Sequence, residues 1–391
     1  MLLLAFAALS GLWDASVTFD QRTVPFRMEI TSSGARASAV ILDGTQRIET
    51  TSGRFDGRTL ELRWAYYDAV LTARLEKGEL RGAYVRRTKQ GPIPRPINAR
   101  PHHAGAPAAK AEADLSGAWI LSPETASARN RAVLEAVFRQ SGAEVAASVQ
   151  RVDGDFGALE GRMAGKRFVL SHFDGVRATL LEGELLADGS LVCVLDQTLR
   201  YHGVRANEAQ ARGLPAPPDP TRFTGVKNPE EPFQFTFPDL DGRPVSLSDA
   251  RFRGKAAILT ITGSWCPNCH EEAPFLVELY EKFGPQGLEI VVLGFEYTGE
   301  PETDRKMLRE FAKRHGIRFP VLLAGSTDEG EVPRKLPQLK DFGAFPTTLF
   351  LDRAHRVRAV HAGFSGPSTG AAYTRLRAET EALVKDLLNQ R

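Results

Sequence analysis

The sequence contains little cysteine, little net charge and no long apolar run. Three of its 391 residues are cysteines, too few for a scaffold held together by disulfide bonds. Its 50 basic and 48 acidic side chains leave a formal net charge of +2, which gives no reason to expect nucleic acid or an acidic membrane surface as a partner. No segment is apolar over the roughly 20 residues that a transmembrane helix needs. These absences leave a globular protein, as the 42% hydrophobic and 25% charged content also indicates.

The chain is long enough for several domains. One ordinary core does not extend over 391 residues, so two or three domains are expected. Proline is concentrated in two stretches, residues 92–113 and 213–232, which we interpret as extended and linker-like. We therefore place linkers at 101–113 and 211–231, two β-rich repeats at 9–100 and 114–210, and a last domain at 232–391.

The first residues resemble the end of a secretory signal. Residues 2–8 are apolar and finish in small side chains suited to cleavage, although the basic start of such a signal is missing. The alternative is that they begin the first strand. We favour the remnant of an export signal at 1–8, and hence a periplasmic or otherwise exported protein.

The first half of the chain repeats itself at a nearly constant offset. The run LSGLW at 9–13 returns as LSGAW at 115–119, and YDAV at 67–70 returns as FDGV at 173–176. A third match, SGRFDG at 52–57 with EGRMAG at 160–165, keeps the same order and indicates an internal duplication. Both copies alternate apolar and polar residues between turn signals such as Asp43-Gly44. The pattern predicts antiparallel β structure, either two small barrels or sandwiches or one larger assembly of both copies.

The most informative feature is the motif Cys266-Pro267-Asn268-Cys269. Apolar residues 256–261 before it predict a buried strand, and residues 270–280 after it predict an amphipathic helix. The first sulfur then lies at a helix N-terminus, where unpaired N–H groups and the helix dipole favour thiolate over thiol. A thiolate attacks disulfide bonds, and the two-residue spacer keeps the second sulfur close enough to form a ring with the first. The motif therefore predicts dithiol–disulfide exchange.

Residues 232–391 resemble the TlpA/ResA branch of the thioredoxin-like thiol–disulfide oxidoreductases. The resemblance rests on the C-x-x-C motif with Pro274 in the next helix, on Phe345-Pro346-Thr347-Thr348 before an apolar strand, and on residues 237–247, which are similar to the N-terminal hairpin of that branch. A helix around residues 304–315 is consistent with the insertion that the branch carries. The resemblance implies an α/β thioredoxin-like domain that acts on protein disulfides.

The resemblance also suggests roles for the residues around the motif. Cys266 is expected to be the exposed attacking sulfur, and Cys269 the buried sulfur that resolves the mixed disulfide. Pro346 is expected to follow a cis peptide bond and to lie against the dithiol, where the backbone beside it, at Phe345, can pair with an incoming peptide. Trp265 would shield the sulfur from one side. No cofactor beyond a redox-active Cys266–Cys269 disulfide, and no metal ion, is expected.

Glu296 is a candidate for proton transfer. It follows the predicted strand 288–293, where members of the ResA branch place a partly buried glutamate near the dithiol. Such a carboxyl group, its pKa raised by the loss of water, could accept the proton that Cys269 must lose. The alternative is an ordinary solvated loop acid. Thr260 stands where thioredoxin has a buried aspartate, so that route to deprotonation is expected to be absent.

Several other interpretations remain open from the sequence. Cys266 to His270 forms the C-x-x-C-H signature of covalent c-type haem, which would make the protein an electron carrier. A peroxiredoxin-like peroxidase would want threonine where Gly263 stands, and one C-x-x-C with one histidine is an incomplete zinc site. Cys193 is expected to be a packed free thiol. The duplicated region could also bind a ligand or partner and bring the redox domain to it.

The sequence thus predicts a duplicated antiparallel β-rich region, barrel- or sandwich-like, followed by an α/β thioredoxin-like domain. We expect an exported enzyme that reduces disulfides of protein substrates, with an upstream thiol as its electron donor. The Pro267-Asn268 spacer leaves the direction of electron flow open.

Overall fold

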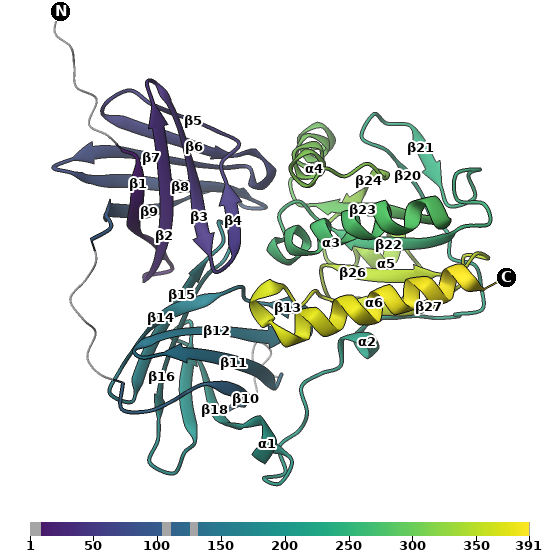
Figure 1. The fold of residues 1–391 in the computed structure, drawn as a ribbon. Helices are drawn as coiled ribbons and strands as arrows, with labels where there is room; N and C mark the ends of the chain where they lie inside the picture. Colours follow the sequence, from purple (N-terminus) through teal and green to yellow (C-terminus); the bar gives the residue numbers. More distant parts are fainter. Residues whose placement is uncertain (1–8, 104–110, 126–131, 391) are drawn as a thin grey trace, which may run out of the picture. The chain divides into compact units, whose positions relative to one another are not determined.

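The computed structural model describes residues 9–103, 111–125 and 132–390. The chain divides into two compact units, residues 1–151 with 156–217, and residues 152–155 with 218–391. Figure 1 shows the elements of both. The export-signal remnant predicted at 1–8 lies outside the described residues.

The duplicated region folds as two sets of strands. The first copy comprises β1 (Gly11–Phe19), β2 (Arg22–Ser33), β3 (Arg36–Asp43), β4 (Gln46–Glu49), β5 (Ser52–Phe55), β6 (Thr59–Trp64), the 3₁₀ helix η1 (Ala65–Tyr67), β7 (Ala69–Glu76), β8 (Glu79–Thr88) and β9 (Gly91–Pro101). The second comprises β10 (Gly117–Pro123), β11 (Leu134–Ser141), β12 (Glu144–Arg151), β13 (Gly154–Asp155), β14 (Leu159–Ala164), β15 (Arg167–Phe173), β16 (Ala178–Leu185), β17 (Leu191–Leu195) and β18 (Leu199–Arg205), followed by α1 (Ala206–Ala209).

Each copy is a closed antiparallel barrel. In the first, the order is β2-β1-β9-β8-β7-β6-β5-β3, and β2 also pairs with β3 to close the ring. The second has the order β11-β10-β18-β17-β16-β15-β14-β12, closed by β11 and β12. Every strand of the second ring has its counterpart at the same place in the first. The structure therefore confirms the duplicated β-rich fold and shows that each copy forms its own barrel, rather than a sandwich or one assembly of both copies.

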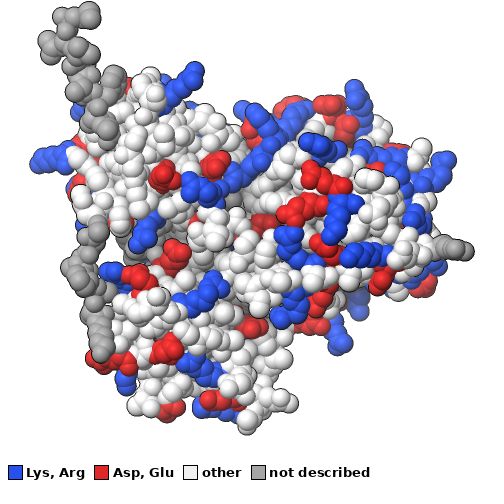
Figure 2. Space-filling model, viewed as in Figure 1, with Lys and Arg blue, Asp and Glu red and all other residues white. Residues whose placement is uncertain are grey.

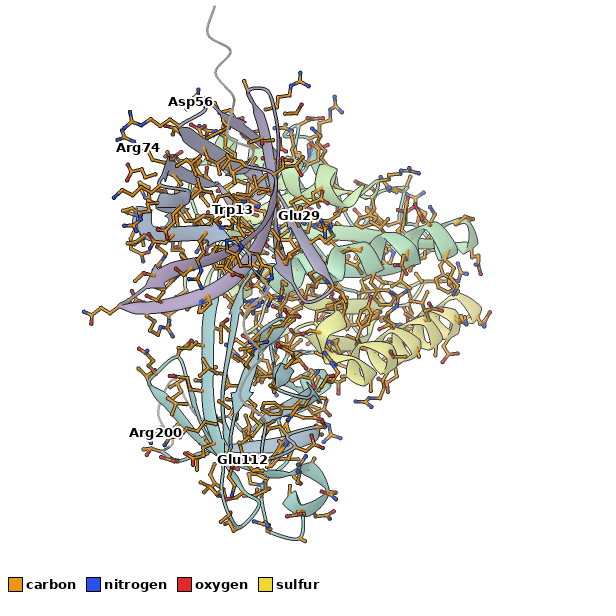
Figure 3. The ribbon with its side chains drawn as sticks, turned by 60° about the vertical axis from the view of Figure 1, so that its left-hand side comes forward. Trp13, Glu29, Asp56, Arg74, Glu112 and Arg200 are labelled. Carbon is orange, nitrogen blue, oxygen red and sulfur yellow. The ribbon has the colours of Figure 1, made fainter. Side chains whose placement is uncertain are left out.

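The repeated Leu-Ser-Gly-x-Trp run has the same local structure in both barrels. The indole Nε1 of Trp13 (Figure 3) donates to the carbonyl of Leu9 at 2.9 Å, and that of Trp119 donates to Leu115 at 2.9 Å. The glycine between them has a positive φ in both copies, +141° at Gly11 and +112° at Gly117. Glycine adopts this conformation at little cost, which explains why it recurs in the motif.

The prolines at the start of the stretch 92–113, which we interpreted as extended and linker-like, form a strand instead. Pro92, Pro94 and Pro96 lie in β9 and pair with β8, whereas β1 pairs with β9 only over Ile97–Pro101. Prolines at every second position direct their missing N–H toward one side of a strand. On that side residues 92–96 have no partner from β1, so no ladder hydrogen bond is lost.

A buried charge cluster joins the two barrels within the first unit. His172 on β15 lies between Asp43, with Nδ1 to Oδ1 at 3.0 Å, and Asp174, with Nε2 to Oδ2 at 3.1 Å. Burial alone would lower the pKa of His172, but the charges and hydrogen bonds of the two carboxylates raise it to about 10. His172 is therefore a cation at neutral pH, matched by carboxylates from both copies.

The repeat offers a matched test of this cluster. Asp174→Asn should lower the free energy of unfolding by about 3 kcal/mol or more, because it leaves a buried cation with one counter-charge fewer. Asp68 occupies the equivalent position of the first copy, where its partly exposed carboxylate pairs with Arg87 at 3.0 Å. Asp68→Asn should cost less than about 1 kcal/mol. Equal losses in urea unfolding of the two variants would contradict this account.

The second unit holds the predicted thioredoxin-like domain. Its elements are α2 (Pro220–Phe223), β19 (Gly225–Val226), β20 (Thr236–Pro238), β21 (Pro244–Ser246), β22 (Ala256–Thr262), α3 (Pro267–Phe283), η2 (Gly284–Gln286), β23 (Leu288–Glu296), α4 (Pro301–His315), β24 (Val321–Ser326), α5 (Glu331–Lys335), β25 (Leu339–Lys340), β26 (Thr347–Leu351), β27 (Val357–Ala362), η3 (Pro367–Thr369) and α6 (Ala371–Asn389).

A five-stranded mixed sheet, β24-β23-β22-β26-β27, forms the centre of this unit. β22, β23 and β24 run parallel, and β26 and β27 are antiparallel to their neighbours. Every residue of β22 and β23 is buried, as continuous apolar runs predict for strands covered on both faces. Apolar side chains of α3, α4 and α6 cover one face, and residues 233–252 with α5 cover the other.

The predicted proline-rich linker at 211–231 contains two short elements. Helix α2 begins after Asp219, whose side chain accepts from the N–H of Thr221, and Pro220 occupies the first helical position. β19 pairs with β25. Among the described residues, no helix combines the length and apolar character needed to cross a bilayer.

Candidate active site

The C-x-x-C motif lies where β22 turns into α3, as predicted. Cys266 is the N-cap of α3 and has an extended backbone, and Pro267 is the first helical residue. The N–H of Cys269 donates to the sulfur of Cys266 at 3.3 Å. The same N–H also donates to the carbonyl of Cys266 at 3.1 Å. The sulfur of Cys266 thus takes the place that a capping side-chain oxygen commonly has at a helix N-terminus.

The structure buries both cysteines, which corrects the prediction that Cys266 is exposed. Cys266 is 4% exposed and Cys269 is 1% exposed. The thiol of Cys266 donates to the carbonyl of Phe345 at 3.6 Å. Phe345, which covers the sulfur, comes from a loop that lies 79 positions further along the chain.

The predicted proline loop lies beside the dithiol. The Phe345–Pro346 peptide bond is cis, and the carbonyl of Pro346 accepts from the N–H of Gly363 at 2.7 Å. Trp265 packs edge-on against the ring of Phe345, with centroids 5.2 Å apart, and donates from Nε1 to the carbonyl of Phe295. The structure thus brings Trp265, Cys266, Phe345 and Pro346 together, as the resemblance implied.

Cys269 is held in a dry environment. Burial, together with the hydrogen bond and charge of Cys266, raises the pKa of the Cys269 thiol well above its usual value. The Thr262 side chain and the backbone of Gly263 act in the opposite direction and favour the thiolate. Cys269 therefore needs a proton acceptor before it can attack.

Glu296 is the last residue of β23 and is fully buried, not a solvated loop acid. Its Oε1 accepts from the N–H of Ser264 at 2.7 Å, and its Oε2 accepts from the hydroxyl of Ser264 at 2.8 Å. Burial raises the pKa of Glu296 to about 8, against these two hydrogen bonds. The carboxyl group thus contacts the turn before Cys266.

A second buried carboxyl group, Glu272, was not predicted from the sequence. It lies one turn after Cys269 on α3 and accepts from the hydroxyls of Thr260, at 2.7 Å, and Thr348, at 2.5 Å. Burial raises the pKa of Glu272 to about 7. Thr260, which stands where thioredoxin has a buried aspartate, therefore contacts a buried carboxyl group that comes from α3. An acid three positions after Cys269, on the helix face with Phe275 and Leu276, was the available signal.

Other candidate residues lie in different surroundings. His270, the histidine of the C-x-x-C-H signature, directs its ring nitrogens to His315 and to the carbonyl of Ser264, so it is placed as a structural hydrogen-bonding group and not as a haem ligand. Within residues 9–103, 111–125 and 132–390, no three His, Cys, Asp or Glu side chains gather as a metal site would need. Cys193 is a buried free thiol on β17, and burial raises its pKa to about 12.

Comparison with known proteins finds relatives of the thioredoxin-like part of the chain. Residues 229–360 match the AhpC/TSA family. The chain is 32% identical over 131 residues to the thiol-disulfide oxidoreductase ResA of Geobacillus thermodenitrificans, a match that covers 33% of this chain and 66% of that one. The thiol-disulfide oxidoreductase ResA of Bacillus subtilis is 27% identical over 200 residues, covering 51% of this chain and 86% of the relative.

These matches have a limited extent. The chain spans slightly less than two thirds of the Geobacillus relative and 62% of ResA from Bacillus anthracis, to which it is 32% identical. Among solved structures, a thioredoxin family thiol:disulfide interchange protein from Chlorobium tepidum is 22% identical, with a TM-score of 0.33, and the match covers 42% of this chain and all of that one.

Proposed function

We propose that this protein is a thiol–disulfide oxidoreductase that reduces disulfides of protein substrates through Cys266 and Cys269. The observation that carries the proposal is the sulfur of Cys266 at the N-terminus of α3, 3.3 Å from the N–H of Cys269 and beside the Phe345–Pro346 loop. The redox group we propose is the cysteine pair itself. The ResA relatives, which are named thiol-disulfide oxidoreductases, support this assignment.

The first step is attack on the substrate. The thiolate of Cys266 attacks one sulfur of the substrate disulfide, the substrate S–S bond breaks, and the second substrate sulfur leaves with the electron pair and takes up a proton. A mixed disulfide between Cys266 and the substrate remains. For this step the substrate backbone would take the place of the Cys266 thiol at the carbonyl of Phe345.

The second step needs a proton acceptor inside the protein. Cys269 loses its proton, attacks the sulfur of Cys266 and releases the substrate as a dithiol, while the protein keeps a Cys266–Cys269 disulfide. We propose that the ionised form of Glu296 accepts this proton, with Glu272 as a second buried acceptor. Burial raises the pKa of both groups, so each carboxylate is a stronger base than a solvated one. The substrate gains two electrons and the dithiol loses two, so an external thiol donor must reduce the pair again.

We also propose that the substrates are exported proteins. Protein disulfides, the substrates of a dithiol reductase, form and persist mainly outside the cytosol. On the face shown in Figure 2, basic and acidic side chains lie interspersed, so this face gives no reason to expect partners of one charge. Export would be tested by locating the protein in fractionated cells.

A direct assay separates this proposal from its rivals. The full chain, reduced with a small dithiol, should reduce insulin disulfides catalytically. It should show no visible haem band, and it should not consume hydrogen peroxide faster than a simple dithiol does. Peroxide consumption without insulin reduction would favour the peroxidase alternative.

A second role, recruitment by the β region, is favoured by one observation. A cavity of about 740 Å³ opens in the first unit and is lined by both barrels, including Phe26, Arg100, Arg139 and Glu160. Binding pockets commonly have volumes of about 300–1,000 Å³. If the region recruits substrates, Ala146→Trp, which narrows this cavity, should leave insulin reduction unchanged but reduce the set of proteins trapped by a Cys269→Ser variant.

A further inference from the structure

Two histidines lie behind the dithiol turn and take part in neither step proposed above. His270 directly follows Cys269 on α3, and His315 is the last residue of α4. Their rings meet with Nδ1 of His270 2.8 Å from Nε2 of His315. The other nitrogen of His270, Nε2, lies 2.8 Å from the carbonyl oxygen of Ser264. Phe311 packs edge-on against both rings, with centroid distances of 4.8 and 5.0 Å.

The partners fix where the protons lie. A carbonyl oxygen only accepts, so Nε2 of His270 carries a hydrogen. When the His270 ring is neutral, its Nδ1 accepts, so His315 donates from its own Nε2. Burial, with the charge of Arg314 acting the same way, lowers the pKa of His315 to about 3, which keeps this ring neutral. The hydrogen bonds therefore run in one direction, from His315 to His270 to Ser264.

Ser264 connects this chain of hydrogen bonds to Glu296. Its carbonyl accepts from His270, while its N–H and hydroxyl both donate to the Glu296 carboxylate. Ser264 is fully buried and lies two residues before Cys266. A shift of this one residue would change both bonds to Glu296.

We infer that His270, oriented by His315, is a positioning residue that fixes Ser264 so that Ser264 holds the Glu296 carboxylate beside the dithiol turn. The consequence for catalysis rests on the proposed function, in which Glu296 accepts a proton. The positioning of Glu296 by Ser264 and His270 does not depend on the proposed function. Two charges act on this chain of hydrogen bonds: that of Arg314 lowers the pKa of His315, and that of Asp304 raises the pKa of Glu296.

His270→Phe tests the inference most sharply. Phenylalanine keeps a ring against Phe311 but leaves the Ser264 carbonyl without its donor. The Ser264 bonds favour the charged form of Glu296, so loosening them should raise the pKa of Glu296, measured by carbon NMR of carboxyl-labelled full-length protein. Insulin reduction should fall about tenfold in kcat, with KM little changed.

Two further variants make the result specific. His270→Gln can still donate to Ser264 and should restore most of both properties. His355→Asn removes a comparable bond, from a histidine nitrogen to the carbonyl of Phe252 at 3.0 Å. His355 follows Leu351, which pairs with Ala257 at the opposite end of β22 from the motif, so this control should change neither property.

The pKa and rate measurements separate the two ideas. An unchanged pKa of Glu296 in His270→Phe would overturn the positioning role whatever the activity. If the wild-type protein had no disulfide reductase activity, the proposed function would be wrong. The comparison of the Glu296 pKa in wild type and His270→Phe would still test the positioning role. If His270→Phe does not fold, His315→Phe, at the partly exposed end of the chain of bonds, should raise the pKa of Glu296 by a smaller amount, and no change there would also overturn it.

Discussion

Cys266→Ser is expected to lower insulin reduction by more than about a thousandfold, because it removes the nucleophile of the first step. No other thiol can take its place. Cys193 is buried in β17 with its pKa raised to about 12, and burial also raises the pKa of Cys269. The measurement is turnover of insulin by the full chain with a saturating thiol donor.

Two further cysteine variants distinguish the attacking sulfur from the resolving sulfur. Cys269→Ser should accumulate a covalent mixed disulfide between Cys266 and the substrate, visible on a non-reducing gel and dissolved by reductant, because no second thiol resolves it. Cys193→Ser is the matched control and should retain wild-type turnover. Activity in Cys266→Ser equal to that of this control would remove the thiol mechanism altogether.

Glu296→Gln is expected to slow turnover about a hundredfold while leaving substrate binding intact, because the amide keeps the shape of the acid but cannot accept a proton. Glu289→Gln provides a control on the same strand. Glu289 is also buried but lies at the start of β23, where it pairs with Arg251 at 2.9 Å and Lys255 at 2.7 Å. Glu289→Gln should unfold more easily in urea but turn over substrate normally. Equal turnover of the two variants would show that Glu296 has only a structural role.

The same carboxyl group makes the fold less stable as pH rises. Its pKa is about 8 in the folded state, against an ordinary value of 4.5, so between these values the unfolded chain gives up a proton that the folded chain keeps. Stability therefore falls as pH rises through this window. Glu296→Gln should remove that part of the fall and be more stable than wild type at pH 8 by a few kcal/mol, since one pKa unit is about 1.4 kcal/mol. A larger loss of stability at pH 8 than at pH 5 in the variant would contradict the sign.

Local patterns in the sequence were enough for the main elements. The apolar run before Cys266 and the amphipathic run after it are continuous in the chain, so strand, turn and helix could be predicted from neighbouring residues. The repeated run around Trp13 and Trp119 could also be recognised in the sequence, because each indole N–H donates to a carbonyl only four residues earlier. The sequence could not decide between barrels and sandwiches. That choice depends on the pairing of β2 with β3 and of β11 with β12, which closes each ring.

What the sequence did not reveal depends on contacts between distant segments. Glu272 receives one of its hydrogen bonds from Thr348, 76 positions away, and His270 meets His315 across 45 positions. The prolines of β9 were misleading for a related reason. They are compatible with a strand only because β1 leaves that side of residues 92–96 unpaired, and a single strand carries no sign of that arrangement.

The central claim is that Cys266 and Cys269 form one reversible redox pair, and disulfide mapping of the full chain tests it most directly. The protein would be oxidised with diamide, its free thiols alkylated, and its peptides analysed by mass spectrometry before and after reduction. We predict a Cys266–Cys269 disulfide that a small dithiol removes, with Cys193 alkylated after unfolding in both samples. Cys266 and Cys269 both alkylated after oxidation, or Cys193 joined to either of them, would contradict the account.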